Sequence, residues 1–142
     1  MQQPTPKSVF VGWVDISPDD WIALGYTDKE SWLEVVKWNN EAFQYEVRRL
    51  LRGVQLTGAK NRSDDDAAGH DLHVKFSNVM FDVESYRLYA TAHLIDTRSK
   101  SEIAKVVRKH YRGGRFTVNN CLQGALKQLA EAVAAAVRTS WR

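Results

Sequence analysis

The sequence has very little cysteine and no long apolar run. Cys121 is the single cysteine, so the chain can form neither an internal disulfide nor a zinc site built from several cysteines. No run of about 18 apolar residues occurs, and we therefore expect no membrane-spanning helix. The chain also opens without a signal-peptide pattern, since Met1–Lys7 is polar and contains proline. We interpret residues 1–8 as a flexible lead, either a tether left after removal of a targeting segment or a frayed native terminus.

Positively charged residues only slightly outnumber negatively charged ones. Twenty Lys and Arg residues against 17 Asp and Glu residues give a net charge of +3, which permits an anionic partner without requiring one. Aromatic residues, in contrast, are many: five Trp, five Tyr and five Phe can supply both core volume and interface anchors. The length of 142 residues fits one domain with one core, which we place over residues 9–142.

The first half of the chain predicts a strand followed by a long helix. Residues 9–16 are rich in β-formers and apolar on both faces, which indicates a central strand. Residues 21–26 can form a short helical turn. From Thr27, which with Glu30 fits a capping box, apolar residues recur at helical spacing up to a stop at Gly53.

The second half predicts four strands and a terminal helix. A short strand over 54–61 and a polar loop over 62–69 come before alternating strands over 71–77 and 88–95. A hairpin over 96–100 leads to a third member of an antiparallel meander, residues 102–111. An alanine-rich helix starts near Thr117. The predicted class is α+β, with a mainly antiparallel sheet, two long helices on one face and the order β-α-β-β-β-β-α.

Three segments of the second half, Asp71–Phe76, Ala92–Lys100 and Ala125–Val133, follow a strand, hairpin and helix pattern. In this the chain resembles small bacterial envelope lipoprotein domains, namely the ABC-transporter auxiliary lipoproteins and relatives with the fold of the TolB N-terminal domain. The resemblance implies a periplasm-facing accessory subunit without catalytic residues, attached to the membrane through a lipid anchor that this chain lacks. The chain departs from the pattern in its tryptophan-rich segment 21–38, in Arg98-Ser99 where the group favours glycine, and in having no lipid-attachment cysteine.

Basic residues are dense between positions 98 and 115. Such a segment can attract phosphate groups of lipids or nucleic acids. Alternation along a strand would divide it between two faces, and a charged, solvated edge strand explains the same residues. Arg112 to Arg115, with Tyr111 and Phe116 beside them, show the mixture of basic and aromatic residues that is typical of single-strand binders. A glycine pair between a strand and a helix is also ordinary loop chemistry. The candidate anion-binding residues are Arg98, Lys105, Arg108, Lys109, Arg112 and Arg115.

The sequence patterns for a metal site and for a catalytic nucleophile are weaker. Three consecutive aspartates, Asp64 to Asp66, together with His70, Asp71 and His73, offer ligands, but a solvated acidic loop accounts for them, and we expect no metal and no cofactor. His93 and His110 have no serine or cysteine motif beside them, and Cys121 fits a small core residue.

The remaining aromatic residues fall on more than one face of the first helix. Trp32 shares a face with Val36, whereas Trp38 and Tyr45 lie on another, where they can anchor a partner. The open face of the sheet offers a second surface through Tyr89, Thr91, His93 and Ile95. The candidate partner-binding residues are Trp21, Tyr26, Trp38, Tyr45, Tyr89 and His93.

We therefore expect a noncatalytic accessory or assembly domain of a bacterial cell-envelope system that docks on a protein partner or on a second copy. The expected location is the periplasm, with outer-membrane anchoring, and the alternative is the cytoplasm. The alternative function is a nucleic-acid-binding module that uses residues 98–115. A third alternative is an enzyme whose site is assembled from scattered residues.

Overall fold

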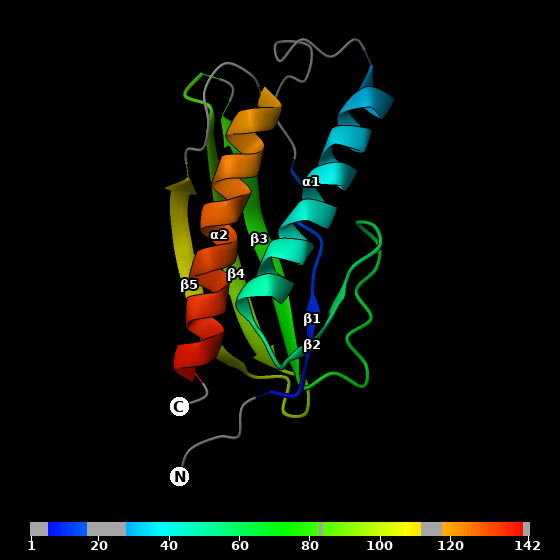
Figure 1. The fold of residues 1–142 in the computed structure, drawn as a ribbon, viewed down its shortest axis with the longest axis vertical. Helices are drawn as coiled ribbons and strands as arrows, with labels where there is room; N and C mark the ends of the chain where they lie inside the picture. The colour runs from blue at the N-terminus through cyan, green and yellow to red at the C-terminus, as the bar shows by residue number, and fades with distance from the viewer. Residues whose placement is uncertain (1–5, 17–27, 83, 112–117, 141–142) are drawn as a thin grey trace.

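The computed structural model describes residues 6–16, 28–82, 84–111 and 118–140, and it has two layers. A five-stranded sheet forms one layer, and two long helices lie side by side on one of its faces (Figure 1). The element order is strand, helix, four strands, helix, so the predicted α+β class and order are confirmed. None of the helices in the described part of the chain is long and apolar enough to span a bilayer.

The sheet is mixed rather than antiparallel throughout. β1 (Ser8–Val11) lies between β2 (Gln55–Gly58) and β3 (Leu72–Asp82) and runs parallel to both. β3, β4 (Arg87–Asp96) and β5 (Glu102–Tyr111) form the predicted antiparallel meander. The parallel part has a topological cause: a helix carries the chain from β1 to its neighbour β2, and such a crossover returns the second strand in the same direction.

β1 is central, as its two apolar faces predicted, but it is shorter than residues 9–16. Pairing with β3 continues as far as Gly12, whose N–H donates to the Val74 carbonyl at 2.8 Å. A Cβ at Gly12 would lie 2.9 Å from that oxygen, so the close approach requires glycine. The predicted lead also ends early, because Pro6 is buried and the Lys7 carbonyl accepts from the Gln55 N–H at 2.8 Å.

Beyond Gly12 the chain pairs with a helix side chain instead of a strand. The amide of Asn40 accepts from the Val14 N–H at 2.7 Å and donates to the Val14 carbonyl at 2.9 Å. Trp32 adds a hydrogen bond from its indole nitrogen to the Ile16 carbonyl at 3.1 Å. Two side chains of the first helix thus hold residues 13–16 where strand pairing has stopped.

The first helix, α1 (Lys29–Leu50), begins one residue later than predicted. Its N-cap is Asp28, whose carboxylate accepts from the Ser31 N–H at 2.7 Å, so the predicted capping box of Thr27 and Glu30 is wrong. Asp28 is the cap because it directly precedes Lys29, the first helical residue. Thr27 itself lies outside the described residues.

The second helix, α2 (Val118–Ser140), runs beside α1 in the same direction, so that both helices end at the same end of the molecule (Figure 1). Parallel neighbours place two negative helix ends together, which favours cations there. Arg138 is such a cation, because its guanidinium donates a hydrogen bond to the Leu50 carbonyl at the end of α1. The apolar stripes of both helices, and Cys121 as predicted, are buried against the sheet.

Candidate functional site

The exposed aromatic residues of α1 form the first candidate surface. Trp38 and Tyr45 are 58% and 63% exposed, although aromatic side chains of this size are usually covered. They lie seven residues apart, and therefore on one face of the helix, away from the sheet. Trp32 is buried instead, which confirms that it shares no face with these two. Trp21 and Tyr26 lie outside the described residues.

Charged side chains continue the line of Trp38 and Tyr45 toward both ends of α1. Glu34 comes one turn before Trp38, and Arg49 comes one turn after Tyr45; both are exposed. Arg49 forms an ion pair with Glu46, and the hydrogen bond that it donates lowers the pKa of the Glu46 carboxyl. We call Glu34, Trp38, Ala42, Tyr45 and Arg49 the outer stripe of α1.

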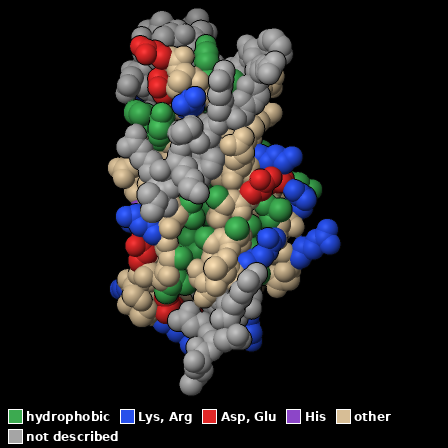
Figure 2. All heavy atoms as spheres, turned by 90° about the vertical axis from the view of Figure 1, so that its left-hand side faces the viewer, with side chains coloured by type: hydrophobic (Ala, Val, Ile, Leu, Met, Phe, Trp, Pro, Cys, Tyr) green, Lys and Arg blue, Asp and Glu red, His purple; other side chains and the backbone are tan. Residues whose placement is uncertain are grey.

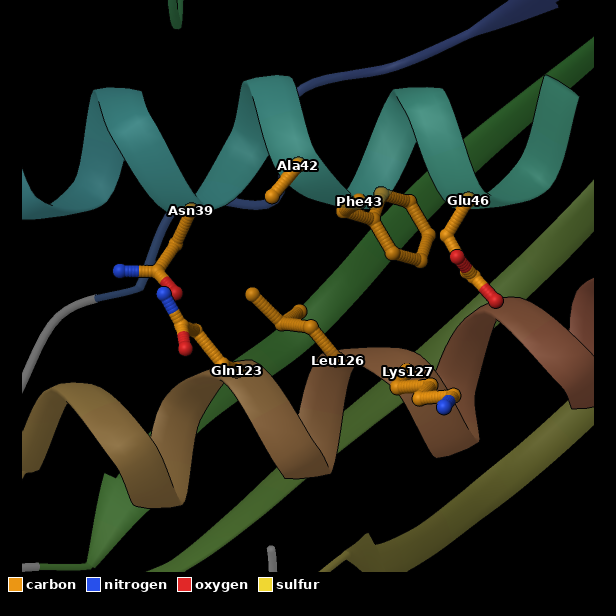
Figure 3. Close-up of a pocket in the computed structure, with 7 residues that line it drawn as sticks. All are labelled: Asn39, Ala42, Phe43, Glu46, Gln123, Leu126 and Lys127. Atoms are coloured by element: carbon orange, nitrogen blue, oxygen red, sulfur yellow. The ribbon is translucent and has the colours of Figure 1, made fainter. Parts of the chain in front are cut away.

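A shallow hollow lies between α1 and α2 (Figure 3). Phe43 and Leu126 point into it, and its two ends are polar. Its volume of about 160 Å³ is below the roughly 300–1,000 Å³ of most small-molecule sites. The hollow is lined by Asn39, Ala42, Phe43, Glu46, Gln123, Leu126 and Lys127.

The face of the sheet opposite the helices holds the second candidate surface. The side chains of Ala92 and Leu94 are buried in the core beneath the helices, so the intervening His93 points to the opposite face. Tyr89 and Ile95 on this face are half-buried, but Thr91 is only 3% exposed. The open face therefore presents fewer accessible groups than its four predicted residues suggested.

His93 makes two side-chain hydrogen bonds on this open face. Its Nε2 lies 2.6 Å from the Ser77 hydroxyl on β3, and its Nδ1 contacts a carboxylate oxygen of Glu102 on β5. The side chains of His93 and Glu102 are 22% and 42% exposed. Because an ionised carboxylate only accepts, Nδ1 carries the proton, and in the neutral ring Nε2 accepts from Ser77. We call these three residues the Ser77 relay.

An irregularity in strand pairing brings Glu102 to the other two residues of the relay. Leu94 pairs with Ala104 and Ile95 pairs with Glu102, so Ile103 is an extra residue that turns Glu102 onto the face of His93. On β3 a second register shift follows Ser77 directly, where Asn78 takes a left-handed backbone with φ of 52°. Sequence reasoning missed Glu102 because strict alternation cannot indicate the bulge at Ile103. Alternation does place Ser77 on the open face, but it does not indicate that the Ser77 hydroxyl reaches the imidazole of His93 on the next strand.

Two lysines flank His93 across the sheet. Lys75 is its pairing partner on β3 and Lys105 its partner on β5, and both are exposed. Directly paired residues have Cβ atoms about 4.5–5.5 Å apart, so both ammonium groups can reach the space above the imidazole. Lys105 is thus placed beside His93 rather than within a continuous basic strip.

The structure describes only part of the predicted anion-binding segment. Arg98 and Lys105 are exposed, whereas the side chains of Arg108 and Lys109, together with all of Arg112 and Arg115, lie outside the described parts. The register shifts between the pairs Ala92–Val106 and Ala90–Lys109, so simple alternation does not extend from Lys105 to Lys109. Figure 2, which shows the side of β5 and α2, has hydrophobic side chains near its middle and described Lys and Arg side chains spread around them.

The acidic loop is held by its own hydrogen bonds. Asp64 accepts from the Lys60 N–H at 2.9 Å, and Asp66 accepts from the Ala68 N–H at 3.1 Å. Within the described ranges no group of three or more acidic, histidine or cysteine side chains is arranged to hold a metal ion.

His73, the second residue of β3, packs as an aromatic residue. Its ring meets that of Phe10 edge-on, with 5.3 Å between centroids, and its Nε2 lies 3.4 Å from an Asp65 carboxylate oxygen. Burial lowers the pKa of His73, although Asp65 acts in the opposite sense. His73 is therefore a neutral, largely buried side chain near neutral pH.

No protein-family model matches the chain, and no curated protein is similar enough to it to be matched. The resemblance to envelope lipoprotein domains therefore stays a prediction.

Proposed function

We propose that this chain is an accessory or assembly domain of a bacterial cell-envelope system, and that it acts by docking on a second copy of itself through α1. The observation that carries the proposal is the exposure of Trp38 and Tyr45 on one face of that helix. Tryptophan and tyrosine are enriched among residues that contribute most to binding energy. Docking of this kind requires no catalytic residue.

The outer stripe of α1 favours a second copy because its residues are self-complementary. In an antiparallel pair of α1 helices whose two-fold axis passes between residues 41 and 42, Trp38 faces Tyr45 of the second copy. The same axis sets Glu34 against Arg49 of the second copy, an attractive pair that occurs twice. Ala42, a small residue at the centre, permits close approach of the two helices.

The assignment to the cell envelope has separate support. It is based on the resemblance carried by Asp71–Phe76, Ala92–Lys100 and Ala125–Val133, and these segments correspond to parts of β3, the β4–β5 hairpin and α2. We propose the periplasm as the location on this ground.

Sedimentation velocity over a range of protein concentrations tests the docking proposal. We expect a reversible dimer, weakened about thirtyfold or more by Trp38→Ser, because an aromatic hot spot contributes about 2 kcal/mol or more. Glu34→Arg should also weaken the dimer, because it sets like charges against each other.

Leu33→Ser is the matched control. Leu33 is 41% exposed on the same helix but lies off the outer stripe, so its replacement should leave the dimer unchanged. A chain that stays monomeric at all concentrations, or a Leu33→Ser variant that dissociates as readily as Trp38→Ser, would refute the proposal.

A further inference from the structure

The Ser77 relay has the roles of a nucleophile, a general base and a group that orients the base. Ser77 Oγ lies 2.6 Å from His93 Nε2, within reach for direct proton transfer. Glu102, bonded to Nδ1, holds the tautomer that leaves Nε2 free to accept the proton. This constellation is recognised by geometry and role, and it recurs on unrelated folds.

We infer that Ser77 is an activated nucleophile that accepts acyl groups from esters. This reactivity goes beyond docking and is independent of it, because the relay and α1 lie on opposite faces of the sheet. The reacting groups are Ser77 and His93, and Glu102 is a positioning residue that acts through His93.

The reaction is a two-step ester hydrolysis with water as co-reactant. Ser77 Oγ bonds to the ester carbonyl carbon while its proton passes to His93 Nε2. The bond from carbon to the alcohol oxygen then breaks, and the departing alcohol takes the proton from Nε2, which leaves Ser77 acylated. Water, deprotonated by His93, attacks the acyl carbon and releases the carboxylic acid, and the proton returns through Nε2 to Ser77 Oγ.

Charge around the relay indicates the class of ester. Lys75 precedes Ser77 by two residues on β3 and therefore shares its face, and Lys105 faces His93 from β5. Ammonium groups at these positions can stabilise the oxyanion that forms on the carbonyl oxygen. They also favour an ester that carries an anionic group.

An alkyl fluorophosphonate tests the inference, because it phosphonylates activated serines: the Oγ–P bond forms, the P–F bond breaks and fluoride leaves. We expect one adduct per chain, on Ser77 by peptide mass mapping, and none on Ser77 in Ser77→Ala. His93→Ala should lower the labelling rate by about 100-fold or more. His93→Gln should do the same, since glutamine keeps a hydrogen-bonding side chain but cannot take up the proton.

Two further variants separate activation from structure. Ser99→Ala removes a hydroxyl that bonds to Asp96 instead of histidine, so the Ser77 labelling rate should stay at the wild-type value. Glu102→Gln keeps an acceptor for Nδ1 but removes the charge, and it should lower the rate about tenfold or more without changing the unfolding midpoint. Absence of an adduct on Ser77, or equal Ser77 labelling in the wild type and His93→Ala, would overturn the inference.

Discussion

Asn40 is the residue whose replacement tests the account of the fold most sharply. Its side chain is fully buried and replaces a strand partner for Val14, with hydrogen bonds of 2.7 and 2.9 Å to that residue and a third of 2.9 Å to the Val36 carbonyl. Asn40→Leu has similar branching but cannot form any of these three bonds. The backbone of residues 13–16 then loses its connection to α1 at this point.

Most of the expected loss in the free energy of unfolding comes from one backbone group, the Val14 N–H. The Val14 carbonyl keeps the Ile16 N–H as a donor at 3.0 Å, and Val36 retains its place in the helix, but the Val14 N–H loses its partner. The unsatisfied Val14 N–H costs about 2 kcal/mol, in the middle of the range for a buried amide, and the two lost bonds to carbonyls that keep another donor add about 0.5 kcal/mol each. We therefore expect Asn40→Leu to lower the free energy of unfolding by about 3 kcal/mol.

Urea unfolding followed by circular dichroism measures this difference. Lys37→Leu, exposed on the same helix and off the outer stripe, is the control, and it should change stability by no more than about 0.5 kcal/mol. Hydrogen exchange of the Val14 amide should be slow in the wild type and faster in Asn40→Leu. A decrease below about 1 kcal/mol, or an equal decrease for Lys37→Leu, would refute the reasoning.

Two predictions concern pH dependence and location. Because burial lowers the pKa of His73 below its ordinary value of 6.5, the unfolded chain binds a proton there before the folded chain does, so the free energy of unfolding should fall as pH decreases from about 6.5 toward the lowered pKa. Urea titrations at pH 7.5 and 5.5 measure this fall, and a His73→Phe variant that keeps the same pH dependence would contradict it. For location, fractionation of cells that carry the natural gene should place the protein in the periplasm, and recovery with cytoplasmic markers would contradict the envelope assignment.

Local sequence patterns were sufficient to predict the helices and strands, but not to predict which strands pair in parallel. Residues 9–16, apolar on both faces, predicted the central place of β1, although β1 ends at Val11, and the predicted bounds of residues 102–111 match those of β5. Nothing in these residues distinguishes a parallel from an antiparallel neighbour, because that choice depends on the path of the chain through α1. Asn40 likewise reads as an ordinary helical residue until the position of Val14 is known.

The candidate surfaces differ in how far the sequence could predict them. Helical spacing placed Trp38 and Tyr45 on a face apart from Trp32, and the structure exposes both. The Ser77 relay could not be predicted, since its residues come from three strands and Glu102 reaches His93 only through the bulge at Ile103. Spacing along the chain carries no information on such an insertion.

Cysteine cross-linking of the outer stripe tests the central claim, that α1 pairs with α1 of a second copy. Ala42 lies beside the proposed two-fold axis, so the Ala42→Cys variants of two copies should form a disulfide-linked dimer under mild oxidation. Lys37→Cys, exposed on the same helix but off the outer stripe, is the control and should stay monomeric, while Cys121 is buried and common to both. Rapid, nearly complete dimer formation by Ala42→Cys alone is the predicted result, and equal cross-linking of both variants, or none, would contradict the account.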